Sequence, residues 1–198
     1  MMMDTLKTLK KILSDDILLP LPDDKGTLRV KEQAPEAKIK TLDISGVPID
    51  SIAFTLDHIP NDRSRGVCFK QLSCYLNATQ EFVNKGCDVV IVSRFKQKWR
   101  ILILDLKSDK PKLGKTEAQL KNSKAFVAYI LSLLNTHYPD YAVPDPRFEL
   151  VIVTTRTRKK SVYKPNEARL EQGPFRVVNP TRYQGGQANV HFGKLIGV

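Results

Sequence analysis

The chain has 198 residues, a length that predicts one domain whose core can form without disulfide or metal cross-links. Hydrophobic residues make up 41% and charged residues 27%, a composition that excludes a natively disordered chain. Lys and Arg number 32 against 21 Asp and Glu, and the formal net charge of +11 favours a polyanionic partner, nucleic acid ahead of an acidic membrane surface.

Residues 4–14 predict a short helix with one apolar face, and Asp4 is placed to act as its N-cap. We expect this helix to close over the core. The alternative is a basic amphipathic helix that leads a membrane-surface or protein-interaction module, and it requires the apolar face to be exposed. A turn-rich connector then extends to residue 26. The residues of the apolar face are Leu6, Leu9, Ile12 and Leu13.

The sequence carries no targeting or cross-linking signal. Its N-terminus lacks the apolar stretch of a secretory signal, and no apolar run approaches the roughly 20 residues that cross a bilayer. The three cysteines form no C-x-x-C pair and lie far in sequence from the histidines, a pattern that argues against zinc and against a disulfide framework. We therefore expect a cytoplasmic protein that does not bind membranes.

The middle of the chain is dominated by predicted strands. From about residue 27 to 58, short β-prone runs appear as TLRVKE, AKIKTLDI and SIAFTLDHI. Residues 87–107 contain two apolar runs, CDVVIVS and WRILILDLK, which predict a hairpin whose strands are covered on both faces. A long helix over 115–137 ends before Pro139, and RFELVIVTT (147–155) is a further buried strand.

The order of these elements predicts a mixed α/β fold in a single domain over residues 1–198. The N-terminal helix and connector occupy residues 1–26, and the core occupies 50–155. A basic, β-rich tail follows over 156–198, with short strands in FRVV and ANVHFGKLI. In the stretch 67–86, NATQEFVN fits a short helix capped by Asn77.

The predicted hairpin brings charged residues together at its open end. If its turn is centred between Lys96 and Gln97, antiparallel pairing matches residues whose numbers sum to 193, and Asp88 lies opposite Asp105. Directly opposed side chains have Cβ atoms roughly 4.5–5.5 Å apart. Lys107 projects from the same face because strand side chains alternate with period two. Two carboxylates and one ammonium therefore converge where the other positions are apolar.

Two adjacent carboxylates destabilise a sheet unless a positive charge lies between them. Mg²⁺, with Mn²⁺ as its substitute, binds carboxylate oxygens and leaves positions for water and phosphate oxygens. Lys107 beside such an ion could orient a water or neutralise charge on a pentavalent phosphate, which suits phosphodiester hydrolysis. The simpler alternative is a solvent-facing ion pair between Asp105 and Lys107, which contributes roughly 0–1 kcal/mol.

Asp88, the hairpin, Asp105-Leu106-Lys107 and a helix with Gln119 near its start resemble the PD-(D/E)XK superfamily of restriction-endonuclease-like nucleases. The resemblance covers roughly residues 50–155. It implies a restriction-endonuclease-like core of the αβββαβ type, with a mixed β-sheet flanked by helices. It also implies that Asp88 and Asp105 are metal ligands, that Lys107 is the catalytic lysine, and that Gln119 belongs to the active site. For an additional acidic ligand, Glu81 and Asp57 are candidates.

Two features of the sequence have structural alternatives. Thr116-Glu117-Ala118-Gln119 fits a capping box, in which the glutamine side chain reaches back to the start of the helix. The basic residues could form a solvated face, but the net charge and their position after the acidic residues favour contact with a phosphate backbone. The candidate nucleic-acid-binding residues are Lys110, Lys112, Lys115, Arg156, Arg158, Lys159 and Lys160.

The sequence therefore predicts a Mg²⁺-dependent endo- or exonuclease that acts on DNA in preference to RNA. The resemblance extends this expectation to a homodimer, or to a partner protein in a larger defence, repair or recombination assembly. The alternative from another class is a non-catalytic nucleic-acid-binding or assembly subunit on the same fold.

Overall fold

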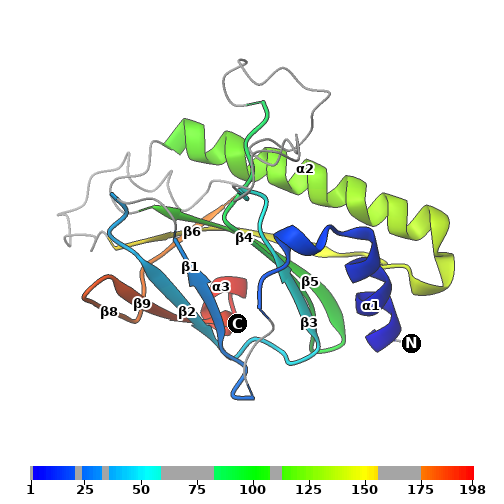
Figure 1. Ribbon diagram of the computed structural model, residues 1–198, viewed down its shortest axis with the longest axis horizontal. Helices are drawn as coiled ribbons and strands as arrows, with labels where there is room; N and C mark the ends of the chain where they lie inside the picture. Colours follow the sequence, from blue (N-terminus) through cyan, green and yellow to red (C-terminus); the bar gives the residue numbers. More distant parts are fainter. Residues whose placement is uncertain (1, 21–23, 33–35, 59–82, 108–112, 156–174) are drawn as a thin grey trace.

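The computed structural model describes residues 2–20, 24–32, 36–58, 83–107, 113–155 and 175–198. Within these residues the chain forms a mixed α/β fold with two mixed β-sheets and three α-helices (Figure 1). Short 3₁₀ turns follow two of the helices, at Asp15–Ile17 and Pro139–Tyr141.

The larger sheet has five strands in the order β3-β4-β5-β6-β7. The first three strands pair antiparallel, whereas β5, β6 and β7 pair parallel. Every described residue in the centre of β4 and β5 is buried, as the two apolar runs predict. The strands are β3 (Ser51–Phe54), β4 (Val89–Phe95), β5 (Lys98–Lys107), β6 (Arg147–Thr154) and β7 (Arg176–Val178).

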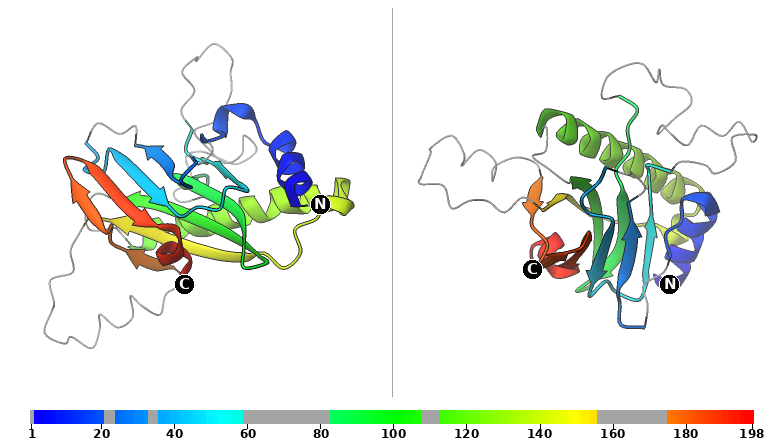
Figure 2. Two further views of the ribbon diagram at one scale, coloured as in Figure 1. Left: turned by 90° about the horizontal axis from the view of Figure 1, so that it is seen from below. Right: turned by 60° about the vertical axis from the view of Figure 1, so that its left-hand side comes forward.

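Two helices cover one face of this sheet. The helix α2 (Leu113–His137) connects β5 to the parallel strand β6 and lies along the sheet, and α1 (Met2–Ile12) packs beside it (Figures 1 and 2). We call the apolar layer between these helices and the sheet the helix-side core. Its members include Leu6, Leu9, Phe54, Val90, Val92, Ile101, Ile103, Leu120, Val127, Leu131, Leu134 and Ile152.

A second sheet covers the opposite face, so only one face of the five-stranded sheet is flanked by long helices. Its four strands run in the order β1-β2-β9-β8, and α3 (Phe192–Ile196) follows β9. The alternate residues of β4, β5 and β6 pack against it in what we call the sheet-side core, with Val89, Ile91, Leu102, Leu104 and Val151 among its members. The strands are β1 (Leu28–Lys31), β2 (Thr41–Ser45), β8 (Arg182–Gln184) and β9 (Gln187–His191).

The hairpin register agrees with the sequence prediction. Val90 pairs with Ile103, and Lys96 and Gln97 form the turn with φ values of 48° and 64°. Positive φ at both central residues is typical of a type I′ turn, whose twist matches that of the flanking strands. Extending the register by one pair beyond Val89 and Leu104 places Asp88 opposite Asp105.

Other predicted elements are confirmed with corrections. The helix over 115–137 begins earlier, at Leu113, and ends at His137 before Pro139. The ANVHFGKLI run is a strand only as far as His191, after which α3 begins because His191 caps the helix through Gly193. The β8 strand was not predicted. The short helix proposed around Asn77 lies outside the described residues.

The N-terminal helix closes over the core, as expected. Leu6, Leu9 and Leu13 are buried and Ile12 is partly buried against the same cluster. This packing argues against the alternative of a membrane-surface or protein-interaction module led by residues 4–14, which requires the apolar face to be exposed. None of the described helices combines the length and apolarity needed to span a membrane.

The buried carboxylate of Glu149 forms ion pairs that connect three neighbouring strands of the large sheet. Glu149 on β6 forms ion pairs with Arg100 on β5 at 2.8 Å, with Arg147 at 2.9 Å, and with Arg176 on β7 at 3.0 Å. Glu149 and Arg100 are both largely buried, so loss of the carboxylate leaves a buried guanidinium without a counter-charge.

We expect Glu149→Gln to lower the free energy of unfolding by about 2 kcal/mol. This loss is smaller than that for breaking a fully buried ion pair, because one of the partners, Arg147, is 67% exposed. Urea unfolding at unchanged m-value measures the effect. Asp43→Asn is the control, since its partner Arg29 is 63% exposed and the change should cost less than about 1 kcal/mol. Equal small effects of the two substitutions would contradict the assigned role of Glu149.

Candidate functional site

The end of the β4–β5 hairpin positions Asp88, Asp105 and Lys107 on one face of the sheet. Val90 and Ile103 belong to the helix-side core, and side chains two residues apart in a strand share a face. Asp88, Asp105 and Lys107 therefore lie on the face covered by α2. The apolar runs of β4 and β5 end here, so these charged groups border the core rather than open solvent.

Asp105 is fully buried, with an exposed fraction of 0%, and its carboxylate is incompletely satisfied. Its Oδ2 atom lies 2.6 Å from Lys107 Nζ. Its Oδ1 atom has no hydrogen-bond partner in the part of the chain that the structure describes. Burial raises the pKa of the Asp105 carboxyl, and the Lys107 ammonium partly opposes this increase in pKa. A buried oxygen without a donor is costly for the fold and is available to a cation.

Asp88 is held by the neighbouring strand. Its Oδ2 atom accepts a hydrogen bond from the backbone N–H of Leu106 at 2.5 Å. Burial, followed by repulsion from the Asp105 carboxylate, raises the Asp88 pKa well above its ordinary value, although the Leu106 hydrogen bond and Lys107 act in the other direction. The Asp105 carboxylate thus destabilises the charged form of Asp88, as like charges in one site do.

Lys107 remains protonated at neutral pH. Burial lowers its pKa, but the carboxylates of Asp105, Asp88 and Asp57 together outweigh burial, and the net shift is upward. Its side chain is 30% exposed, so the ammonium can contact both Asp105 and a molecule arriving from solvent. A protonated lysine can donate hydrogen bonds and stabilise negative charge, but it cannot accept a proton.

Two further carboxylates influence this end of the sheet. Asp57 follows β3, and its own pKa is raised by burial and by Glu32 but lowered by Lys107. Glu32 follows β1 and also acts on the pKa of Asp88. The sequence indicates Asp57 as a candidate acidic ligand. It does not indicate Glu32, because Glu32 follows a strand of the second sheet and no local sequence pattern links that strand to the site. The other candidate acid, Glu81, lies outside the described residues.

The site is chemically suited to a divalent cation. Two carboxylates with raised pKa values and one unpartnered buried oxygen would all be stabilised by a hard cation, which prefers oxygen ligands. Within the described ranges, no three His, Cys, Asp or Glu side chains lie close enough together to enclose a metal ion. Asp88 and Asp105 could therefore bind a partly hydrated ion such as Mg²⁺, which keeps several waters.

The raised carboxyl pKa gives a testable stability profile. A carboxyl with a raised folded-state pKa binds protons better in the folded than in the unfolded chain. Its contribution to the free energy of unfolding is therefore present in acid and is lost as the pH rises through the folded-state pKa. Asp88→Asn stays neutral at every pH. In the presence of EDTA at pH 7, we expect it to stabilise the protein by about 1 kcal/mol, or raise Tm by about 2–4 °C.

The same measurement at pH 4 serves as the control, because Asp88 is then largely protonated and the gain should disappear. A lower Tm of Asp88→Asn at pH 7 would show instead that Lys107 and Leu106 stabilise the ionised carboxylate more than its neighbours destabilise it.

Gln119 does not form the predicted capping box. Because α2 begins at Leu113, residues 116–119 lie inside the helix and Thr116 is not its N-cap. The Gln119 Nε2 atom donates to the carbonyl oxygen of Gly86 at 2.5 Å. Gly86 lies two residues before Asp88, so Gln119 joins the site through the chain that leads into β4.

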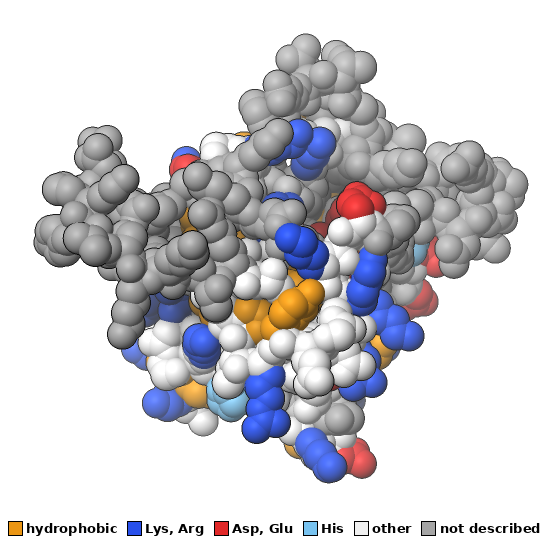
Figure 3. Space-filling model, turned by 90° about the vertical axis from the view of Figure 1, so that its left-hand side faces the viewer, with side chains coloured by type: hydrophobic (Ala, Val, Ile, Leu, Met, Phe, Trp, Pro, Cys, Tyr) orange, Lys and Arg blue, Asp and Glu red, His pale blue; other side chains and the backbone are white. Residues whose placement is uncertain are grey.

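The structure places one of the predicted nucleic-acid-binding residues. Lys115 is exposed on the first turn of α2, which begins six residues after Lys107 at the end of β5. Lys and Arg side chains are also spread over the face shown in Figure 3, with fewer Asp and Glu side chains between them. The other six predicted residues, Lys110, Lys112, Arg156, Arg158, Lys159 and Lys160, lie outside the described residues.

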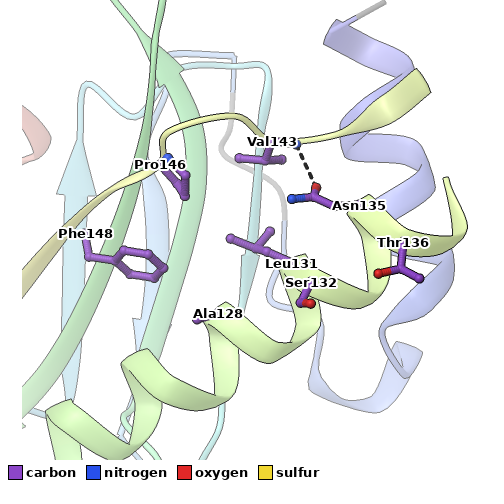
Figure 4. A pocket seen from close by; sticks show the side chains of 8 residues that line it. All are labelled: Ala128, Leu131, Ser132, Asn135, Thr136, Val143, Pro146 and Phe148. Carbon is purple, nitrogen blue, oxygen red and sulfur yellow. Dashed lines mark hydrogen bonds between the residues drawn. The ribbon is translucent and has the colours of Figure 1, made fainter. Parts of the chain in front are cut away.

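A pocket of about 330 Å³ lies elsewhere, against the last turns of α2 (Figure 4). Its wall is fixed by a hydrogen bond from the Val143 backbone to Asn135 Oδ1 at 3.1 Å. None of Asp88, Asp105 and Lys107 lines it. The pocket is therefore not the site that the carboxylates indicate.

No protein-family model, curated protein or solved structure matches the chain.

Proposed function

We propose that the protein is a Mg²⁺-dependent nuclease that hydrolyses phosphodiester bonds, in DNA rather than RNA. The observation that carries the proposal is the contact of the buried Asp105 carboxylate with Lys107 at 2.6 Å, beside the second carboxyl of Asp88. A solvent-facing ion pair would not require burial of Asp105 or raise the pKa of both carboxyls. A metal site does require such a concentration of charge.

The chain order of the elements supports a restriction-endonuclease-like core. Apart from β1 and β2, which lie between α1 and β3, the helix α1, the antiparallel strands β3, β4 and β5, the helix α2 and the parallel strand β6 occur in the αβββαβ order of the PD-(D/E)XK resemblance. In that comparison Asp88 immediately precedes the second core strand, and Asp105 and Lys107 lie at the end of the third. The second sheet and α3 are additions to this order.

The proposed chemistry divides between the ion and the side chains. Asp88 and Asp105 would hold the ion, which when bound polarises the phosphate and lowers the pKa of a water. Lys107 donates hydrogen bonds from its ammonium to the phosphate oxygen on which negative charge accumulates. Since its pKa is raised, Lys107 acts as a charge stabiliser and not as the base that removes the proton from water.

The direct test is cleavage of labelled single-stranded and duplex DNA and of RNA by the purified protein with Mg²⁺ or Mn²⁺, with EDTA as the control. Calorimetry with Mn²⁺ measures binding of the ion separately from cleavage. We expect ion binding and DNA cleavage that EDTA abolishes. A protein that binds no Mn²⁺ and degrades none of the three substrates is not a nuclease.

The second candidate is a non-catalytic nucleic-acid-binding or assembly subunit, which the net charge of +11 favours. Such a protein would bind DNA with a steep salt dependence but would bind no Mn²⁺. In either function, the salt dependence of DNA binding should weaken when four basic residues are neutralised together: Arg156, Arg158, Lys159 and Lys160. The slope of the logarithm of the binding constant against the logarithm of the salt concentration should fall by about one unit for each lost phosphate contact. Metal binding therefore separates the two candidates, and DNA binding does not.

A further inference from the structure

Gln119 is attached to the backbone that presents Asp88. Its side chain leaves the second turn of α2, is partly buried, and donates from Nε2 to the carbonyl oxygen of Gly86. The donated hydrogen bond uses the side-chain amide, which is the group that a substrate contact would need. The bond therefore connects the helix that covers the sheet to the residue two positions before Asp88.

Gly86 is also confined from its other side. A Cβ atom at this position would overlap the carbonyl oxygen and the Cβ atom of Leu56, so the two chains approach as closely as glycine allows. One residue later, the Leu56 N–H donates to the carbonyl oxygen of Cys87 at 3.1 Å. The segment that enters β4 is thus held between Leu56 and Gln119.

This confinement opposes an electrostatic force. Asp88 and Asp105 repel each other when both are ionised, and after burial the Asp105 carboxylate is the largest cause of the raised pKa of Asp88. A flexible segment before Asp88 would let this carboxylate move away from Asp105, and the two groups would no longer present their oxygens together. A glutamine suits this position because it donates to a carbonyl without adding charge beside two carboxylates.

We propose that Gln119 is a positioning residue, which fixes Asp88 for metal binding by holding the Gly86 carbonyl and does not contact the nucleic acid. The inference rests on the proposed metal-dependent function of the site. It assigns Gln119 an effect on affinity for the ion rather than on affinity for the substrate. Partners that orient metal ligands commonly change metal affinity by about 10–100-fold.

The test compares Gln119→Met, which keeps the length and loses the donor, with Gln119→Glu, which turns an acceptor toward the carbonyl. Mn²⁺ calorimetry gives Kd, and cleavage of a DNA oligonucleotide at saturating Mn²⁺ gives KM. We expect Kd for Mn²⁺ to rise about tenfold in Gln119→Met and further in Gln119→Glu, with KM for DNA unchanged. Glu117→Gln is the control, because it removes only the ion pair of Glu117 with Lys121 on the same helix.

Each result has one meaning. All variants are measured at least 15 °C below their own Tm, so that a purely structural role would lower Tm but leave the Mn²⁺ Kd unchanged. An unchanged Kd in a folded variant overturns the inference. A raised KM with unchanged Kd also overturns it, because Gln119 would then contact the substrate. A wild-type protein that binds no Mn²⁺ overturns the proposed function itself, whatever the variants do.

Discussion

Asp105→Asn should abolish Mn²⁺ binding and DNA cleavage while the protein stays folded. The substitution removes the charge of the fully buried carboxylate and one of its two ligand oxygens, and leaves the shape of the side chain. Loss of a residue that merely orients a ligand reduces activity by up to about 100-fold, so loss of a ligand should exceed that factor. Calorimetry, a cleavage time course and circular dichroism measure the three properties.

DNA binding without metal should be retained or slightly stronger in Asp105→Asn, because one negative charge is removed from beneath the site that the phosphates would approach. Asp43→Asn is the matched control, since Asp43 pairs with Arg29 in the second sheet. Unfolding of Asp105→Asn would contradict the proposal and would mean that the Asp105–Lys107 pair holds the hairpin together. Normal cleavage by a folded Asp105→Asn would exclude Asp105 as a ligand.

Lys107→Ala should separate cleavage from metal binding. An ammonium is not a ligand for Mg²⁺ or Mn²⁺, so the ion should still bind. Cleavage should fall by about 10²–10⁴-fold, the range for loss of a group that assists proton transfer or stabilises charge in the transition state. Single-turnover cleavage at saturating Mn²⁺ measures the loss.

Lys194→Ala is the control for Lys107→Ala, because Lys194 is an exposed lysine on α3, where its Nζ donates to the Asn179 carbonyl. A Lys107→Ala protein that cuts DNA at the wild-type rate refutes the role of this lysine. Loss of the ion together with cleavage would mean that Lys107 holds Asp105 in place for the metal and does not act on the substrate.

The hairpin and its charged end could be predicted from the sequence because both depend on local rules. Continuous apolar runs indicated strands covered on both faces, and a turn at Lys96 and Gln97 fixed the register. Once the register was known, period-two alternation placed Asp105 and Lys107 on one face. The burial of Asp105 followed from its position at the end of a run of apolar residues.

The remaining features depend on contacts between distant segments. The capping-box prediction for Gln119 failed because the helix begins at Leu113, three residues before Thr116. The Gln119 side-chain amide instead donates to the carbonyl oxygen of Gly86, which lies far earlier in the chain. The second sheet was missed as a unit because β2 pairs parallel with β9 at the other end of the chain. No local pattern encodes that pairing.

The pairing of β2 with β9 also sets an order of assembly during synthesis. Thr41 pairs with Gln187, so the second sheet cannot close until almost the whole chain has left the ribosome. Until then, the face of the large sheet that carries Leu102 and Leu104 lacks the part of its cover that β9 and α3 supply. The nascent chain therefore exposes part of an apolar β-surface from the synthesis of β5 until the synthesis of β9, which makes binding by a chaperone, or aggregation in its absence, a property of this topology.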